Sequence, residues 1–270
     1  MEMFSYAFMI RALFASLCMA ILAPLLGVFL VTRRQSLMAD TLSHVSLAGI
    51  ALGFFLGVNP TITTLAIVIL AAVLLEILRF MYKSYSEIST VMIMSGGLAL
   101  ALLLMGLSDD APMKINQFLF GSIITISNAQ VVLLLVLTLT MLVLFLLFKR
   151  PMYVLTFDED IAHVDQLPVR FMSLLFNIFT GVAITIMIPI AGSLLVSAVM
   201  ILPAAIGMKL GKSFNSVVFY GIGIGLLGMI GGLVTSYQLD VAPGAMITLI
   251  FIGLFLLCSL GQWMIRKVQS

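Results

Sequence analysis

The stretch SLMADTLSHVSLAGIALGFFLG, residues 36–57, places two ionisable side chains inside an otherwise apolar or small-residue run. Asp40 is the only charged residue between Arg34 and Glu76, and His44 is the only histidine there. Residues four apart lie on one face of an α-helix, so this carboxylate and imidazole can converge on one cation. Ionisable groups at membrane depth are costly and usually mark a transport path or a functional site.

A purely structural interpretation of the same pair stays open. Asp40 can cap the start of a helix whose first turn carries Thr41. His44 can be a buried histidine that is hydrogen-bonded to a backbone carbonyl. Spacing alone does not separate this interpretation from a metal site.

The composition indicates an all-α, polytopic membrane protein. The 270 residues are 63% hydrophobic and 9% charged, with a mean hydropathy of +1.27, far from the composition of soluble domains. The net charge of +2 gives no indication of nucleic-acid binding. Cys18 and Cys258 are isolated in apolar runs, so neither a disulfide framework nor a CxxC metal site is indicated.

Apolar runs of about 20 residues, the length that spans a bilayer, predict about nine transmembrane helices in a single transmembrane domain, 1–270. Eight spans are the alternative. The predicted spans are 9–32, 37–57, 60–82, 88–107, 128–148, 168–189, 192–210, 214–236 and 244–266.

The basic residues favour nine spans. With the N-terminus outside and the C-terminus cytoplasmic, eleven of the thirteen Lys and Arg residues fall on the inner side, as the positive-inside rule requires. These residues are Arg33, Arg34, Arg79, Lys83, Lys149, Arg150, Arg170, Lys209, Lys212, Arg266 and Lys267. Losing one span would put basic clusters on both sides of the membrane.

Other spans carry features of dense packing. Glycines at GxxxG spacing between Gly221 and Gly232 predict close helix contacts. Glu76 and Arg79 lie three apart near the inner end of the third span, where we expect them to pair and to reach the membrane surface.

The longest inner segment predicts a short amphipathic helix over 157–166. Phe157, Ile161 and Val164 recur at helical spacing, while the acidic residues face elsewhere. Anionic lipid would select Lys and Arg on the polar face, so an acidic face favours a protein partner. The residues predicted to meet that partner are Phe157, Asp158, Glu159, Ile161, Ala162 and Val164.

With these features in view, the chain resembles the integral-membrane permeases of bacterial ATP-binding-cassette (ABC) importers for zinc and manganese. The matching pieces are RRQSLMADTLSHVSLAGIALG (33–53), FLFGSI (118–123), DEDIAHVD (158–165), GSLLVSAVMILPAAIG (192–207) and GGLVTSYQLDVAPGAMITL (231–249). The resemblance covers nearly the whole chain. The chain departs from the family at Gln166, where a glycine often ends the inner helix.

The resemblance implies a type II ABC importer-like permease in the bacterial cell membrane. It implies a homodimer of permease copies, a cytoplasmic ABC ATPase dimer that meets the inner helix, and an extracellular or periplasmic metal-binding protein. The aspartate and histidine of the D-x-x-S-H motif, here Asp40 and His44, line the path in that family. No permanently bound cofactor is expected. The expected cargo is Zn²⁺, because the SHVSLAG run more closely resembles the zinc members, and Mn²⁺ is the alternative.

Two other classes of function remain as alternatives. An ATP-independent secondary transporter or channel should carry more intramembrane carboxylates for a proton relay. An intramembrane metalloprotease should carry an HExxH-like ligand set, whereas this chain has two histidines in all. The chain has no GxxxxGK[ST] phosphate loop, so ATP hydrolysis requires a partner.

Overall fold

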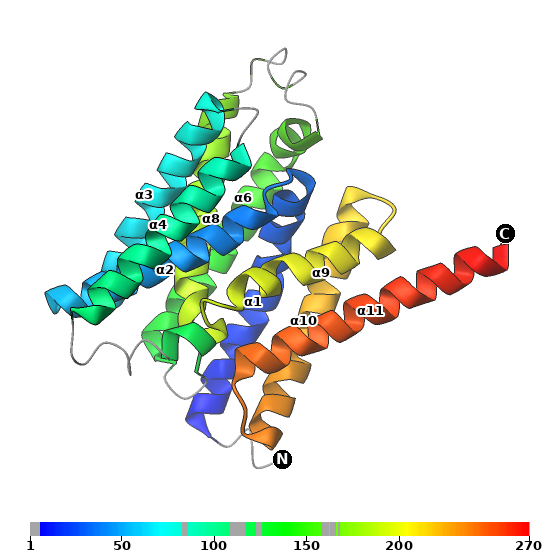
Figure 1. Cartoon of the computed structure of the whole chain (residues 1–270). Helices are drawn as coiled ribbons and strands as arrows, with labels where there is room; N and C mark the ends of the chain where they lie inside the picture. The colour runs from blue at the N-terminus through cyan, green and yellow to red at the C-terminus, as the bar shows by residue number, and fades with distance from the viewer. Residues whose placement is uncertain are drawn as a thin grey trace.

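The computed structural model describes residues 6–82, 86–107, 117–122, 126–157, 162, 166 and 168–269, and within these ranges it contains helices and turns but no strand (Figure 1). Nine helices of 15 residues or more follow one another within these ranges. They are α1 (Ala7–Thr32), α2 (Ser36–Leu56), α3 (Pro60–Met81), α4 (Ser86–Gly106), α6 (Asn128–Phe157), α8 (Val169–Ala191), α9 (Val196–Leu210), α10 (Phe214–Leu239) and α11 (Pro243–Gln269).

Local sequence signals explain the sharp connections around α2. Arg34 adopts a left-handed conformation with φ of 55°, and the following Gln35 N–H donates to the carbonyl of Leu30, which reverses the chain after α1. At its other end α2 stops at Gly57, whose φ of 66° suits a residue without a Cβ. Asn59 then caps α3 through its side chain, with Pro60 as the first helical residue.

The helices form two groups that meet at α2 and α9. One group joins α2 to α3 and α4, with α8 packed on α3, and the other joins α1 to α9, α10 and α11. Contacts of α2 with α9, and of α6 with both α1 and α8, connect the groups. Figure 1 shows the first group on the left and α9 to α11 on the right.

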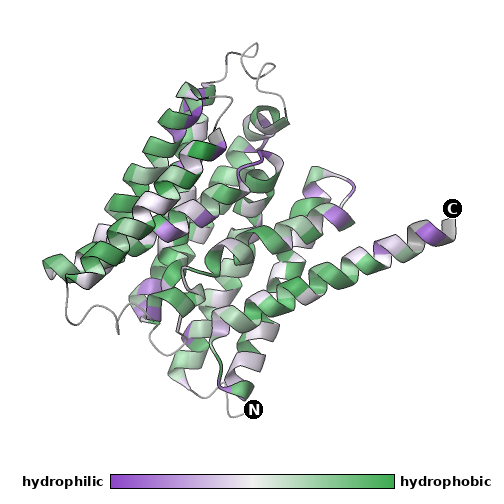
Figure 2. Cartoon of the chain, in the orientation of Figure 1, coloured by the Kyte–Doolittle hydropathy of each residue, from purple (hydrophilic) through white to green (hydrophobic). Residues whose placement is uncertain are grey.

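Most residues of the helices are apolar, as expected for a protein in lipid, and hydrophilic residues gather mainly near helix ends (Figure 2). The C-terminal ends of α1, α3 and α9 point toward the same end of the molecule as the C-terminus of the chain (Figure 1). Because these ends carry Arg33, Arg79 and Lys209, the positive-inside rule assigns that end to the cytoplasm.

The observed helices can be compared with the predicted number of spans, about nine with eight as the alternative. Eight of the described helices are long and apolar enough to cross a membrane. The seventh predicted span, 192–210, contains only the 15-residue α9, which is about 22 Å long and shorter than the hydrocarbon core. The fifth predicted span, 128–148, is part of the 30-residue α6, which continues to Phe157.

The segment between α8 and α9 is non-helical, and its first two residues are buried. Gly192 has a φ of 87°, and Ser193 is only 1% exposed. The N–H groups of Ser193 and Leu194 donate to the carbonyls of Phe118 and Leu119, at 2.7 and 3.3 Å. The outer segment around Phe118 therefore enters the protein and supplies the hydrogen bonds that the interrupted helix lacks.

The glycines of α10 make the close contacts that their spacing predicts. A Cβ atom at Gly225 would lie 2.6 Å from the carbonyl oxygen of Ala20 in α1, whereas a Cβ at Gly223 would meet no atom within 4 Å. Absence of a side chain at Gly225 thus allows the α1 and α10 backbones to approach.

We expect Gly225→Leu to lower the midpoint of thermal unfolding in detergent, because overpacking of a tight contact costs about 1–3 kcal/mol. Gly223→Leu, in the same helix, is the matched control and should leave the midpoint nearly unchanged. Equal effects of the two substitutions would show that the α1–α10 contact is not tight.

Candidate functional site

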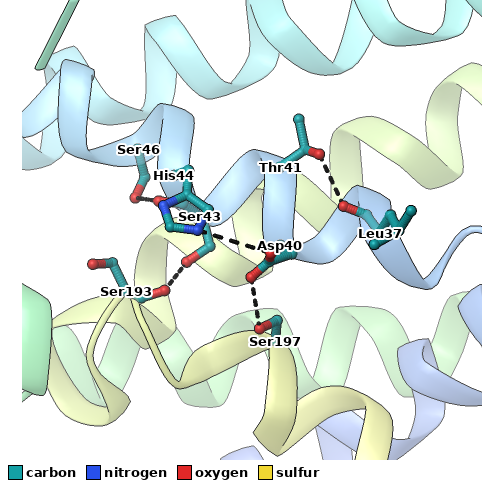
Figure 3. Close-up of polar contacts among 8 residues, drawn as sticks. All are labelled: Leu37, Asp40, Thr41, Ser43, His44, Ser46, Ser193 and Ser197. Carbon is teal, nitrogen blue, oxygen red and sulfur yellow. Dashed lines mark hydrogen bonds and ion pairs between the residues drawn. The ribbon is translucent and has the colours of Figure 1, made fainter. Parts of the chain in front are cut away.

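Helix α2 holds Asp40 and His44 on one face near its cytoplasmic end (Figure 3). The His44 Nε2 atom lies 3.8 Å from the Asp40 Oδ2 atom. The two side chains are partly open, with 38% of Asp40 and 21% of His44 exposed. This is the arrangement that a cation needs if it is to reach both groups.

The break before α9 faces this pair. Ser197, the second residue of α9, donates a hydrogen bond from its hydroxyl to Asp40 Oδ1 at 3.1 Å. Ser43 of α2 donates its hydroxyl to the carbonyl of Ser193, within the non-helical segment. Figure 3 shows Ser193 and Ser197 approaching α2 from the neighbouring chain segment. Asp40 and His44 therefore lie where a hydroxyl and an unwound backbone also supply oxygen atoms.

The structural alternative for the pair does not fit this geometry. Helix α2 begins at Ser36 with Gln35 as its N-cap, so Asp40 is the fifth helical residue and caps nothing. In the part of the chain that the structure describes, the buried Nδ1 atom of His44 has no hydrogen-bond partner, so no backbone carbonyl holds this imidazole. A buried polar atom without a partner is unusual, and the structural alternative therefore does not account for this nitrogen.

One chain alone offers an incomplete metal site. No group of three or more His, Cys, Asp or Glu side chains able to hold a metal ion occurs among the described residues. A zinc ion usually takes four ligands, so two side chains would leave positions for water, hydroxyls or a second protein copy. Loose, shared coordination suits an ion that must be released again.

The predicted inner helix lies mostly outside the described residues. Phe157 is the last residue of α6 and is 58% exposed, and Ala162 is helical and buried in a small apolar cluster with Leu155 and Val169. Asp158, Glu159, Ile161 and Val164 fall outside the described residues. The role of this segment stays a prediction.

The position after the inner helix has the geometry that favours a glycine. Gln166 has a φ of 54°, in the left-handed region, which a residue without a Cβ adopts readily. At this position the chain therefore places a residue with a Cβ in a conformation that glycine adopts more readily.

Sequence reasoning missed Ser43, Ser193 and Ser197 as parts of the site. The available signal was the run from Pro189 to Gly192, which interrupts two apolar stretches. That run reads as an ordinary turn between spans, and only the fold brings it beside α2.

We expect Ser43→Ala to destabilise the protein, because it leaves the buried carbonyl of Ser193 without its side-chain donor, a loss of about 1–3 kcal/mol. Ser46→Ala is the matched control, because the Ser46 hydroxyl donates only to the Ser43 carbonyl within α2. Thermal unfolding of the purified variants measures the difference. Similar midpoints for both variants would argue against a role of Ser43 in holding the break.

Comparison with known proteins matches nearly the whole chain to a family of transport proteins. The profile of the ABC 3 transport family matches residues 5–262. A "Probable metal transport system membrane protein" of Treponema pallidum is 32% identical over 257 residues, covering 94% of this chain and 96% of the relative.

Relatives named for different metals match at similar levels. The "High-affinity zinc uptake system membrane protein ZnuB" of Haemophilus influenzae is 26% identical over 91% of this chain and 94% of its own length. The "Manganese import system permease protein ScaB" of Streptococcus parasanguinis is 29% identical, over 93% and 90%. Among solved structures, PsaBC of Streptococcus pneumoniae in complex with Fab matches with a TM-score of 0.84 and 26% identity, covering 95% of this chain and 92% of that one.

Proposed function

The chain belongs to the ABC 3 transport family, and we propose that it is the permease subunit of an ATP-driven divalent metal importer, with zinc as its cargo and Asp40 and His44 on the path of the ion. It is a multi-pass protein of the bacterial membrane, with eight helices of spanning length among its described residues. The observation that carries the proposal is the open pair formed by Asp40 and His44, with Nε2 and Oδ2 3.8 Å apart beside a break in the neighbouring helix.

The site binds the ion transiently rather than tightly. The ion exchanges some of its water for the Asp40 carboxylate and a nitrogen of His44, and the partial exposure of both groups lets water return as it leaves. The Ser197 hydroxyl fixes the orientation of the Asp40 carboxylate through Oδ1, which leaves Oδ2 directed toward His44. Binding that is favourable but incomplete allows the ion to move on.

A homodimer completes the coordination in this proposal. A two-fold axis beside the pair would bring two carboxylates and two imidazoles to one pore. The incomplete ligand set of a single chain supports this arrangement. The partial exposure of Asp40 leaves room for a second copy to contribute.

The energy for transport comes from outside the chain. A cytoplasmic ATPase dimer binds the inner segment 157–166, where the exposed ring of Phe157 packs against Tyr153 with ring centroids 4.6 Å apart. An external metal-binding protein delivers the ion on the opposite side of the membrane. The names of relatives as permease and membrane proteins of import and uptake systems support this division of labour.

The choice of zinc rests on ligand chemistry. A mixed nitrogen and oxygen set suits tetrahedral zinc, whereas manganese favours oxygen ligands. The similarity to a relative named for zinc uptake supports this choice, and relatives named for manganese make manganese the second candidate.

We expect Asp40→Asn and His44→Gln each to reduce metal uptake to less than about a tenth, because each removes a ligand from a site that has few. Uptake of zinc and manganese is measured in cells that carry the variant, with the neighbouring ATPase supplied or withheld. Asp240→Asn, in the turn after α10, is the control for removing a carboxylate elsewhere.

Expression and dimer assembly of both variants should match the wild type. Loss of assembly instead would make the pair structural. Uptake without the ATPase would favour the alternative of a secondary transporter or channel, and would remove the proposed role of segment 157–166.

We expect His44→Asp to shift the ratio of zinc to manganese uptake toward manganese by about tenfold or more, because the change replaces nitrogen with oxygen at the site. The measurement is competitive uptake of the two ions from one mixture. An unchanged ratio in a variant that still transports would mean that His44 does not contact the ion.

A further inference from the structure

A polar cavity lies at the cytoplasmic ends of the helices, apart from Asp40 and His44. Its volume is about 480 Å³, and the residues that line it come from the end of α1, the start of α2, the end of α3, the start of α4, and α8. The charged side chains among its described lining residues are Arg33, Arg34, Arg79, Arg170, Glu76 and Glu87. Four guanidinium groups against two carboxylates give the cavity a net positive charge.

The buried carboxylate of the cavity, that of Glu76, already has partners within the protein. Glu76 is 2% exposed and accepts a hydrogen bond from the side-chain amide of Asn177 in α8. Arg79 lies 3.9 Å from the same carboxylate. The expected pairing of Glu76 with Arg79 is confirmed, but Glu76 is buried and does not reach the membrane surface. It compensates for charge inside the cavity wall.

Two of the arginines meet at a neutral group. Arg33 donates to the hydroxyl of Ser173 at 2.5 Å, and Arg79 approaches the same hydroxyl oxygen at 3.5 Å. Two like charges that converge on one uncharged oxygen raise the positive potential of the space in front of them.

The other two arginines stand at the mouth of the cavity. Arg34 is exposed on the α1–α2 turn, and Arg170 is exposed at the start of α8, where its guanidinium lies 5.5 Å from the ring centroid of Phe80. Neither side chain forms an ion pair within the ranges that the structure describes. Their planar guanidinium groups remain available for a bidentate acceptor.

The depth and the rim of the cavity indicate which anion fits. Helices α1 and α3 end here and α2 and α8 begin here, so the arginines lie at the level of the lipid headgroups on the cytoplasmic side. Leu37, which lines the cavity, is 55% exposed, and Phe171, which follows Arg170 in the sequence but lies outside the cavity lining, is 62% exposed. These two exposed apolar side chains form a rim beside the basic interior, and the combination matches a molecule with a phosphate group and acyl chains.

We propose that this cavity binds the phosphate group of an anionic membrane phospholipid, held by Arg34 and Arg170 at the mouth. Basic pockets between transmembrane helices at the cytoplasmic side are suited to such headgroups, and arginine matches phosphate through paired N–H donors. Free inorganic phosphate shares this chemistry, and the exposed apolar rim favours the lipid. The proposal is independent of which metal the protein moves.

The test measures lipid retention on the purified protein by native mass spectrometry. The probes are phosphatidylglycerol and phosphatidylcholine with identical acyl chains, mixed in equal amounts in detergent. We expect wild-type protein to retain phosphatidylglycerol in preference. Arg34→Gln and Arg170→Gln should each lower that preference about fivefold, the effect of one basic side chain near an anionic lipid.

Lys212→Gln is the matched control. It removes one positive charge from the turn between α9 and α10, at the same side of the membrane, and Lys212 does not line the cavity. Both arginines to be changed are exposed, and Arg34→Gln alone is sufficient for the test if Arg170→Gln fails to fold.

Each outcome decides the proposal. Loss of the phosphatidylglycerol preference in the arginine variants but not in Lys212→Gln supports the proposal. If millimolar inorganic phosphate does not displace the retained lipid, the bound phosphate group belongs to the lipid. Displacement by inorganic phosphate, with phosphate itself retained, keeps the anion site but assigns it to the free ion. An unchanged lipid preference in the arginine variants overturns the proposal, even if those variants no longer bind the ATPase.

Discussion

Backbone polar groups inside a membrane must find partners within the protein, and this constraint organises the region around the candidate metal path. Irregular backbone at that depth survives only where it is buried in protein or lines a cavity. The segment 192–195 meets the requirement through two partners, the outer segment at Phe118 and Leu119 and the hydroxyl of Ser43. The interruption that makes α9 short is thus stabilised from both sides.

Helix α2 combines two functions because of its place in the fold. It packs on α3 and α4 along one side and meets α9 along another, which makes it one of the helices that connect the two groups. Asp40 and His44 lie on the side that faces α9, while the start of the helix contributes Leu37 and Met38 to the basic cavity. A movement of α2 relative to α9 would change the candidate metal site directly, because Ser197 and Asp40 belong to different groups of helices.

The sequence predicted the parts of the structure that depend on local composition. Apolar runs of the right length located the helices to within a few residues, apart from the extension of α6 to Phe157, and GxxxG spacing predicted the contact at Gly225. The four-residue spacing also predicted that Asp40 and His44 lie on one helix face. The hydrogen bond from Ser197 and the support from Phe118 could not be predicted in this way, because they join segments more than 70 residues apart along the chain and depend on tertiary packing.

The pairing of the outer segment with the helix break depends on two glycines. Gly121 has a φ of 74° and Gly192 a φ of 87°, and a Cβ atom at either one would collide with the backbone of the other segment. Every missense change in those two codons adds a Cβ atom. Genetic screens for lost transport should therefore recover both positions as readily as Asp40 or His44, although neither glycine has a side chain with which to bind the ion.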